Sequence, residues 1–445
     1  MTASTEELLD GLIRDTLRAG ADAADARISE NAGLSVEVRN GHLESVEREE
    51  SRGLSLRALV GKRQAHVSAT DLSPSALKEL SQRVVDMARQ APEDKWCGLP
   101  SSSEITSDRP DLKLDCDDTP QADELERRAV EMEAAAMAIG GIKQVSHSGA
   151  SWQTATSWFA ASNGFIARKS SGIASLAAVA IAEQNGAMER DYESWSERRG
   201  ARMPAPTAIG KEAGNRAAAR LGSRKIDSQT APVIFENRLS SRLLGAFIGA
   251  ISGPAIARGV SFLKDKMGKP VFAPGVDVVD DPLLVGGFGS RSFDGEGRPV
   301  KRTALVKDGV LTQWLLNGPS ARQLGLEPNG FSSMGFGDPP GVSTLNLDIR
   351  PGKRSLAELM SDAGDGLFVT DMFGPSLNPN TGDYSVGVSG FWFEKGLRAY
   401  PVSEITVAGD LPSMLLRAVP GSDLEIRSST NAPSLLIDGL ALAGR

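Results

Sequence analysis

The stretch that decides the fold is LSVEVRNGHLESVE, residues 34–47. Apolar and polar residues alternate on both sides of Asn40-Gly41, as they do in a strand with one buried face. Asn-Gly is the strongest short signal for a two-residue hairpin turn. The stretch therefore predicts two antiparallel strands, 34–38 and 43–47, within an antiparallel sheet.

The residues on either side extend this hairpin into a small α+β unit. Before it, a capping-box pattern opens a helix whose apolar residues recur at helical spacing over residues 4–17. After it, residues 53–60 alternate again and residues 64–70 return, and Ser73-Pro74 opens a second helix. We expect a helix, a small antiparallel sheet and a helix in residues 1–95.

A polar, acidic segment interrupted by proline follows at residues 96–118 and is typical of a linker. The next unit, residues 119–225, is expected to be α+β as well. Its predicted helices lie at 121–139 and 207–221, with strands between them that turn at Ser162-Asn163-Gly164.

The remaining residues, 226–445, have a different character. A strand at 233–235 and an apolar helix at 239–251 come first, and glycine and proline then punctuate many short β-like runs. We therefore expect an α+β protein in which an N-terminal mixed helix and antiparallel-sheet part precedes a large β-rich C-terminal domain.

Composition narrows the class of protein. The formal net charge is -8 and no stretch forms a basic arm, so nucleic acid is not an expected partner. The two cysteines, Cys97 and Cys116, form no disulfide framework and favour a reducing compartment. Residues 1–10 lack the pattern of a signal peptide, and the apolar residues 243–257 are too few to span a bilayer. We expect a cytoplasmic protein without a membrane segment.

Common catalytic motifs are absent from the sequence. The three histidines, His42, His66 and His147, all lie in the first third and none stands near an acid or cysteine in a motif. They are better interpreted as strand residues than as metal ligands. The chain has no H-E-x-x-H, no paired cysteine motif and no G-x-S-x-G, so it offers no ligand set for a classical zinc site.

Three weaker patterns each have a functional and an ordinary structural interpretation. The glycine-rich residues 286–291 lack the spacing of a phosphate-binding loop and favour a tight β-turn. Asp277, Asp280 and Asp281 suggest a hard-cation site less strongly than an acidic turn. Arg190-Asp191-Tyr192 fits a polar contact site and a solvated strand end equally well.

The most specific pattern is NPNTGDYS at residues 378–385, followed by Gly390-Phe391-Trp392. Together with further runs in the same order, it resembles the TldD/TldE (PmbA) family over nearly the whole chain. These further runs are YPVSEITVAG at 400–409, GLSV at 33–36, ATDLSP at 69–74 and ERDY at 189–192.

That family has two kinds of subunit. The TldD kind carries H-E-x-x-x-H on a helix and takes a further cysteine ligand from near its C-terminus, whereas the TldE or PmbA kind lacks these groups. Here Gly245 and Ala250 occupy the histidine positions, Ala246 occupies the glutamate position, and residues 428–445 hold no cysteine. The resemblance to the TldE kind therefore implies no catalytic residue and no metal in this chain, with zinc in a partner. The helix is also consistent with simple packing through small residues.

The resemblance implies a metal-free subunit that forms a heterodimer with a TldD-type subunit. The pair would be a cytoplasmic metallopeptidase acting on unfolded or modified peptides, which can add as a strand to a sheet edge. Two other functions stay open: a stand-alone peptide-binding protein, as a monomer or a homodimer, and a hydrolase of unrecognised chemistry. The physiological peptide and the interface residues are not given by the sequence.

Overall fold

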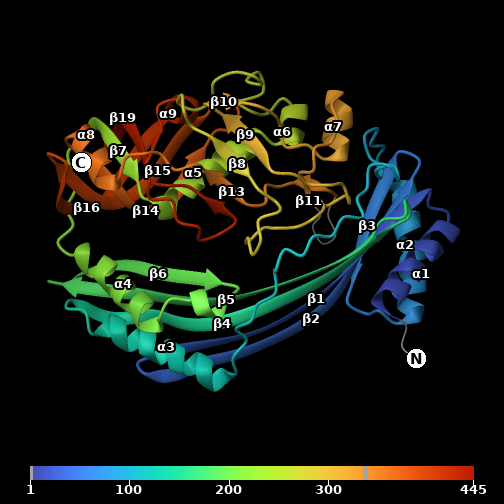
Figure 1. Cartoon of the computed structure of the whole chain (residues 1–445), viewed down its shortest axis with the longest axis horizontal. Helices are drawn as coiled ribbons and strands as arrows, with labels where there is room; N and C mark the ends of the chain where they lie inside the picture. Colours follow the sequence, from blue (N-terminus) through green and yellow to red (C-terminus); the bar gives the residue numbers. More distant parts are fainter. Residues whose placement is uncertain (1–3, 334–338, 445) are drawn as a thin grey trace.

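The computed structural model describes residues 4–333 and 339–444 of the chain. It has two parts: a long curved sheet with helices on one face, and a β-rich body that lies over the other face (Figure 1). The predicted α+β class, with a β-rich C-terminal part, is confirmed.

The first part is built on one antiparallel sheet with the strand order β3-β2-β1-β4-β5-β6. Asn40 and Gly41 have φ values of 55° and 73°, so the predicted hairpin turn is confirmed. The strands are β1 (Ala23–Arg39), β2 (His42–Val60), β3 (Arg63–Ala69), β4 (Ile142–Ala161), β5 (Ile166–Gln184) and β6 (Ala187–Glu197).

The prediction of a small sheet within residues 1–95 was wrong. Strand β1 pairs with β4 from Asp25↔Ala161 to Val38↔Ser148, so a single sheet runs through both expected N-terminal units. The length was missed because residues 29–33 of β1 and residues 48–52 of β2 are polar or small and show no apolar alternation.

Four helices cover one face of this sheet. Even-numbered side chains of β1, such as Ile28 and Val36, pack against them, so the odd-numbered side chains lie on the opposite face. The predicted capping box is confirmed, since the Ser4 hydroxyl accepts from the Glu7 backbone N–H at 3.1 Å. The helices are α1 (Thr5–Arg18), α2 (Pro74–Gln90), α3 (Ala122–Met137) and α4 (Pro206–Ala219), with a short 3-10 turn at Gly200–Arg202.

The β-rich body contains a closed five-stranded barrel. Its strands follow the order β16-β15-β14-β7-β19, and β16 also pairs with β19 to close the ring. The strands are β7 (Gln229–Phe235), β14 (Gly366–Leu377), β15 (Asp383–Glu394), β16 (Leu397–Asp410) and β19 (Leu435–Ala443), with β17 (Val419–Pro420) added to β19.

Shorter elements complete the body. A second sheet has the order β10-β9-β8-β13-β18, and β11 pairs with β12. The strands are β8 (Val278–Asp280), β9 (Thr303–Lys307), β10 (Val310–Leu311), β11 (Ser332–Ser333), β12 (Gly341–Val342), β13 (Leu347–Ile349) and β18 (Thr430–Asn431). The helices are α5 (Asn237–Ala250), α6 (Gly253–Ala257), α7 (Gly318–Leu324), α8 (Leu356–Ala363) and α9 (Leu411–Leu415).

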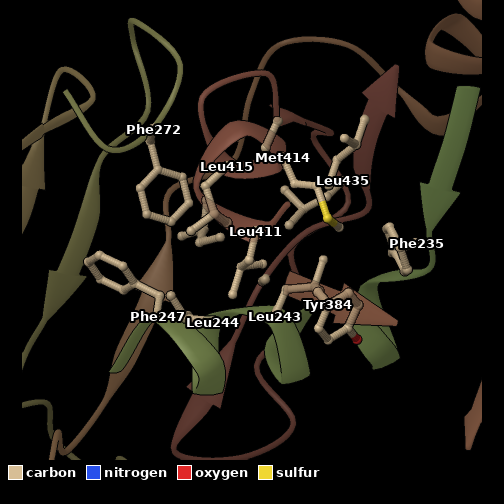
Figure 2. Packing of buried hydrophobic residues seen from close by; sticks show 14 of the residues in the cluster. Phe235, Leu243, Leu244, Phe247, Phe272, Tyr384, Leu411, Met414, Leu415 and Leu435 are labelled. Carbon is tan, nitrogen blue, oxygen red and sulfur yellow. The ribbon is translucent and has the colours of Figure 1, made fainter. Parts of the chain in front are cut away.

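Helix α5 is buried along one side only. Leu243, Leu244 and Phe247 point into a core that also holds Leu411 and Met414 of the α9 segment (Figure 2). No helix in residues 4–333 or 339–444 has the length and apolarity needed to cross a membrane.

The segment between α2 and α3 is packed along both parts of the molecule. Leu114 accepts from the Gly172 N–H of β5 at 2.9 Å, and Leu112 accepts from the Gly286 N–H of the body at 2.7 Å. Cys97, expected in polar surroundings, is only 2% exposed. The segment therefore ties the body to the sheet.

Helices α3 and α4 cross closely at Gly210, where an added Cβ would overlap the carbonyl oxygen of Met132. We predict that Gly210→Ala lowers the free energy of unfolding by about 1–3 kcal/mol, because backbone must move apart. The matched control is Gly11→Ala in α1, where an added Cβ meets nothing within 4 Å. It should instead stabilise the protein by about 0.5–1 kcal/mol. Urea unfolding of both variants tests this, and equal midpoints would contradict it.

Candidate functional site

A cavity of about 910 Å³ lies between the helix-free face of the sheet and the body. We call it the chamber. Its floor comes from residues of five neighbouring strands, β2, β1, β4, β5 and β6, and its roof from Phe288, Gly289 and residues 427–429. Alternation places Asn31, Gly33 and Ser35 on the floor while their neighbours face the helices.

The chamber floor is polar and rich in hydroxyl groups. Ser175 and Ser196, which both line it, lie 2.8 Å apart between their Oγ atoms. Ser35, Ser151 and Ser171 also belong to the lining. Each hydroxyl can donate one hydrogen bond and accept others, so the floor suits a polar, extended ligand better than an apolar one. The sequence signal was available: small polar residues recur at every second position of these strands.

A smaller cavity of about 180 Å³ shares Ser196, Arg427 and Ser428 with the chamber and reaches Asn237 and Ser241 of α5. The chamber therefore extends to the helix that the sequence singled out.

Ser241, Gly245 and Gly249 follow one another at i+4 spacing and therefore lie on the same side of α5. We call these three residues the α5 stripe. Both glycines are exposed, and an added Cβ would meet nothing within 4 Å at either position. This side of α5 thus offers space without functional groups.

The three positions that the family resemblance assigns to the zinc motif differ in their exposure. Gly245 is exposed, Ala246 is partly buried, and Ala250 is in the body's core with 6% exposure. None of them has a donor atom. Within residues 4–333 and 339–444, no cluster of three or more His, Cys, Asp or Glu side chains is placed to hold a metal ion. The residues present do not fit a zinc ion.

The glycine-rich residues 286–291 act through their carbonyl groups and not as a phosphate cradle. Arg198, which is 7% exposed, donates to the carbonyl oxygens of Gly286 at 3.3 Å and Phe288 at 2.9 Å. It also donates to Leu114 of the connecting segment at 3.0 Å. Arg198 therefore joins the sheet, this segment and the body at the roof of the chamber.

The three aspartates of the acidic turn bind backbone N–H groups. Asp277 accepts from Asp308 at 2.7 Å, Asp280 from Leu345 at 2.7 Å and Asp281 from Leu283 at 3.2 Å. Burial raises the pKa of Asp280 to about 6. The three carboxylates hold loops in place and do not converge on a cation.

The histidines lie on three separate strands. His42 begins β2, His66 lies in β3, and His147 lies in β4, 3.2 Å from Glu37. They do not converge with one another, and none lines the chamber.

Asp191 resolves the pattern that the sequence left open. It is 4% exposed and lies 3.4 Å from Arg238 of α5 and 3.7 Å from Arg220, the residue directly after α4. Burial raises the pKa of Asp191, and the two arginines oppose that rise. The interpretation as a solvated strand end was wrong, because β6 is the strand that faces the body.

Asp191 belongs to a buried ion network that spans the two parts of the molecule. Glu193 of β6 pairs with Arg216 of α4 at 3.3 Å and also with Arg427 of the body. Glu236, directly before α5, pairs with Arg216 at 2.7 Å and with Arg238 at 3.0 Å. Sequence reasoning missed these arginines, because nothing local distinguishes a buried arginine from a surface one.

These features define a class: a two-part α+β protein with a polar chamber between a long sheet and a barrel-containing body. Family models for the PmbA/TldA metallopeptidase match domain 1 at residues 24–88, the central domain at 115–221 and the C-terminal domain at 228–444. The chain belongs to the PmbA/TldA metallopeptidase family.

Relatives agree with this assignment. The metalloprotease PmbA of Escherichia coli O157:H7 is 35% identical over 96% of this chain and 93% of its own length. A solved structure from Bacteroides thetaiotaomicron superimposes with a TM-score of 0.92 at 26% identity, covering 100% of both chains. TldE from Thermococcus kodakarensis has a TM-score of 0.87 at 17% identity over 98% of this chain and 100% of its own, which shows the same fold.

The ion network should carry much of the docking between the two parts. We predict that Arg238→Met costs about 3–5 kcal/mol of unfolding free energy, because Asp191 and Glu236 would keep buried charge without this partner. Arg83→Met is the matched control, since its pair with Glu79 is exposed and contributes about 0–1 kcal/mol. Denaturant unfolding measures both, and similar losses for the two variants would refute the network's role.

Metal content is the second test of the site. We predict that the purified chain binds no stoichiometric zinc, because Gly245, Ala246 and Ala250 supply no ligand. Elemental analysis after dialysis against zinc measures this. About one tightly held zinc ion per chain, lost on substitution of α5 residues, would contradict the prediction.

Proposed function

We propose that this chain is the metal-free, TldE-type subunit of a cytoplasmic metallopeptidase and that a TldD-type homologous subunit supplies the zinc site. The observation that carries the proposal is the bare stripe of α5 in a chain that belongs to a metallopeptidase family. The stripe begins at Ser241, which lines the smaller cavity beside the chamber, and its two glycines offer no ligand and no base. If this protein takes part in peptide hydrolysis, another subunit must supply the catalytic groups.

The chamber supports a peptide as the ligand. A peptide in extended form rises about 3.3 Å per residue and presents N–H and C=O groups on alternate sides. The hydroxyl, amide and backbone groups of the floor can pair with such a chain, and they place little demand on its side chains. Unfolded or modified peptides fit this requirement, whereas a folded protein does not enter about 910 Å³.

A second candidate function is a stand-alone peptide-binding protein, as a monomer or a homodimer. The observation in its favour is that residues of one chain form both floor and roof of the chamber. A hydrolase of other chemistry has less support. Within the part of the chain that the structure describes, no histidine lines the chamber as a base for its serines.

The two leading functions differ in assembly. We predict a stable one-to-one complex with a family member that carries H-E-x-x-x-H, with peptide cleavage that neither chain shows alone. Interfaces of obligate pairs usually bury more than about 2,000 Å². Size-exclusion chromatography with light scattering, run beside a peptide-cleavage assay, tests both points. A partner fully active alone, which this chain neither binds nor affects, would favour the stand-alone binding protein.

A further inference from the structure

Positive charge gathers at one end of the chamber floor. Lys169 lies on β5 one pleat beyond Ser171, which lines the chamber, and alternation puts both on the same face of the sheet. Arg27 donates to the Ser157 hydroxyl at 3.1 Å, and Ser157 is the β4 residue directly opposite Lys169. Arg198 donates to the carbonyl oxygen of Gly172, three residues along β5 from Lys169. The charges of Arg27, Arg198 and Arg291 also act on the Lys169 ammonium. These four cations come from β1, β5, the end of β6 and the roof loop, so the fold brings them together from distant sequence positions.

Three members of this cluster, Lys169, Arg198 and Arg291, have little compensating negative charge beside them. Within residues 4–333 and 339–444, Lys169 has neither a hydrogen bond nor an ion pair, although it is partly buried. Arg198 is held by backbone carbonyl groups, and Arg291 donates to the Ser332 carbonyl at 2.8 Å. No carboxylate lies within ion-pair distance of Lys169, Arg198 or Arg291 in those residues.

Two buried carboxylates act on the cluster from a distance. Asp280 and Asp294 both attract the charge of Arg291, but each also binds backbone N–H groups. Asp294 accepts from Glu296 and Arg298, each at 2.9 Å. These acids therefore do not neutralise Lys169.

Grouped cations without counter-ions are costly to bury unless an anion completes them. Burial first, and then the charges of the three arginines, lower the pKa of Lys169 to about 8, so a nearby anion would stabilise its charged form. At the end of a polar groove, that requirement is met by an anionic ligand.

We propose that Lys169, with Arg27, Arg198 and Arg291 around it, forms an anion subsite that holds a carboxylate of an extended peptide lying in the chamber. The proposal rests on the proposed function and deepens it, because it says at which end of the chamber the carboxylate of a bound peptide lies. The carboxylate can be the C-terminal one or that of an acidic side chain near the end of the peptide. Both present the same planar pair of oxygens to the cations.

Three dansyl-labelled hexapeptides distinguish these sources: a free acid, its C-terminal amide, and an amide whose last residue is Glu. Fluorescence titration measures their Kd with the full chain, alone and with the family partner. We expect the free acid, the Glu-terminated amide or both to bind roughly tenfold more tightly than the plain amide, which corresponds to about 1.4 kcal/mol. The peptide that binds more tightly than the plain amide shows whether the bound carboxylate is the C-terminal one or that of a side chain.

Lys169→Met should abolish this preference, so that the three peptides bind the variant with similar Kd values. Arg168→Met is the matched control: it removes the same charge one residue away, where Arg168 is exposed on the other face beside Trp158. It should leave the preference intact. Thermal melts of both variants show that the fold is kept.

The outcomes separate the two claims. Equal Kd values for all three peptides, or a preference that survives Lys169→Met, would overturn the subsite while leaving peptide binding in place. If no peptide binds in any form, the proposed function fails and the subsite fails with it.

Discussion

The buried ion network between β6, α4 and the start of α5 is the interaction on which the rest of the structure depends. Asp191 and Glu193 extend from the last strand of the sheet, and Arg238 and Arg427 meet them from the body. Paired charges of this kind tolerate only narrow geometry, because any unpaired member is costly when buried. The network therefore sets how the body lies over the sheet, and with it the width of the chamber.

The chamber face of the sheet and the open side of α5 differ in their chemistry. The sheet face offers hydroxyl groups, amides and, at one end, cations, so it has the chemistry of recognition. The open stripe of α5 has the opposite character, with Gly245 and Gly249 leaving space and no reactive group. This contrast supports the proposal that the chain contributes recognition and that a partner subunit contributes catalysis.

The sequence predicted features that depend on local chemistry. Asn40-Gly41 marked its turn because its dihedral angles suit few other residue pairs, and Ser4 with Glu7 marked the start of α1. Features set by long-range packing were missed. The polar half of β1 was not recognised as strand, and the buried states of Asp191 and Arg198 depend on residues far away in sequence. The assignment of Gly245, Ala246 and Ala250 as vacated metal positions came from family resemblance and remains a prediction.

The central claim is that this chain contributes binding surface and no catalytic group. The most direct measurement uses a reconstituted pair in which only the partner's H-E-x-x-x-H glutamate is replaced by glutamine, a change that preserves size and leaves both histidines. If the claim holds, peptide cleavage falls to the uncatalysed background while peptide binding to the pair is retained. Cleavage that persists with the altered partner would show that this chain supplies catalytic groups of its own and would contradict the account.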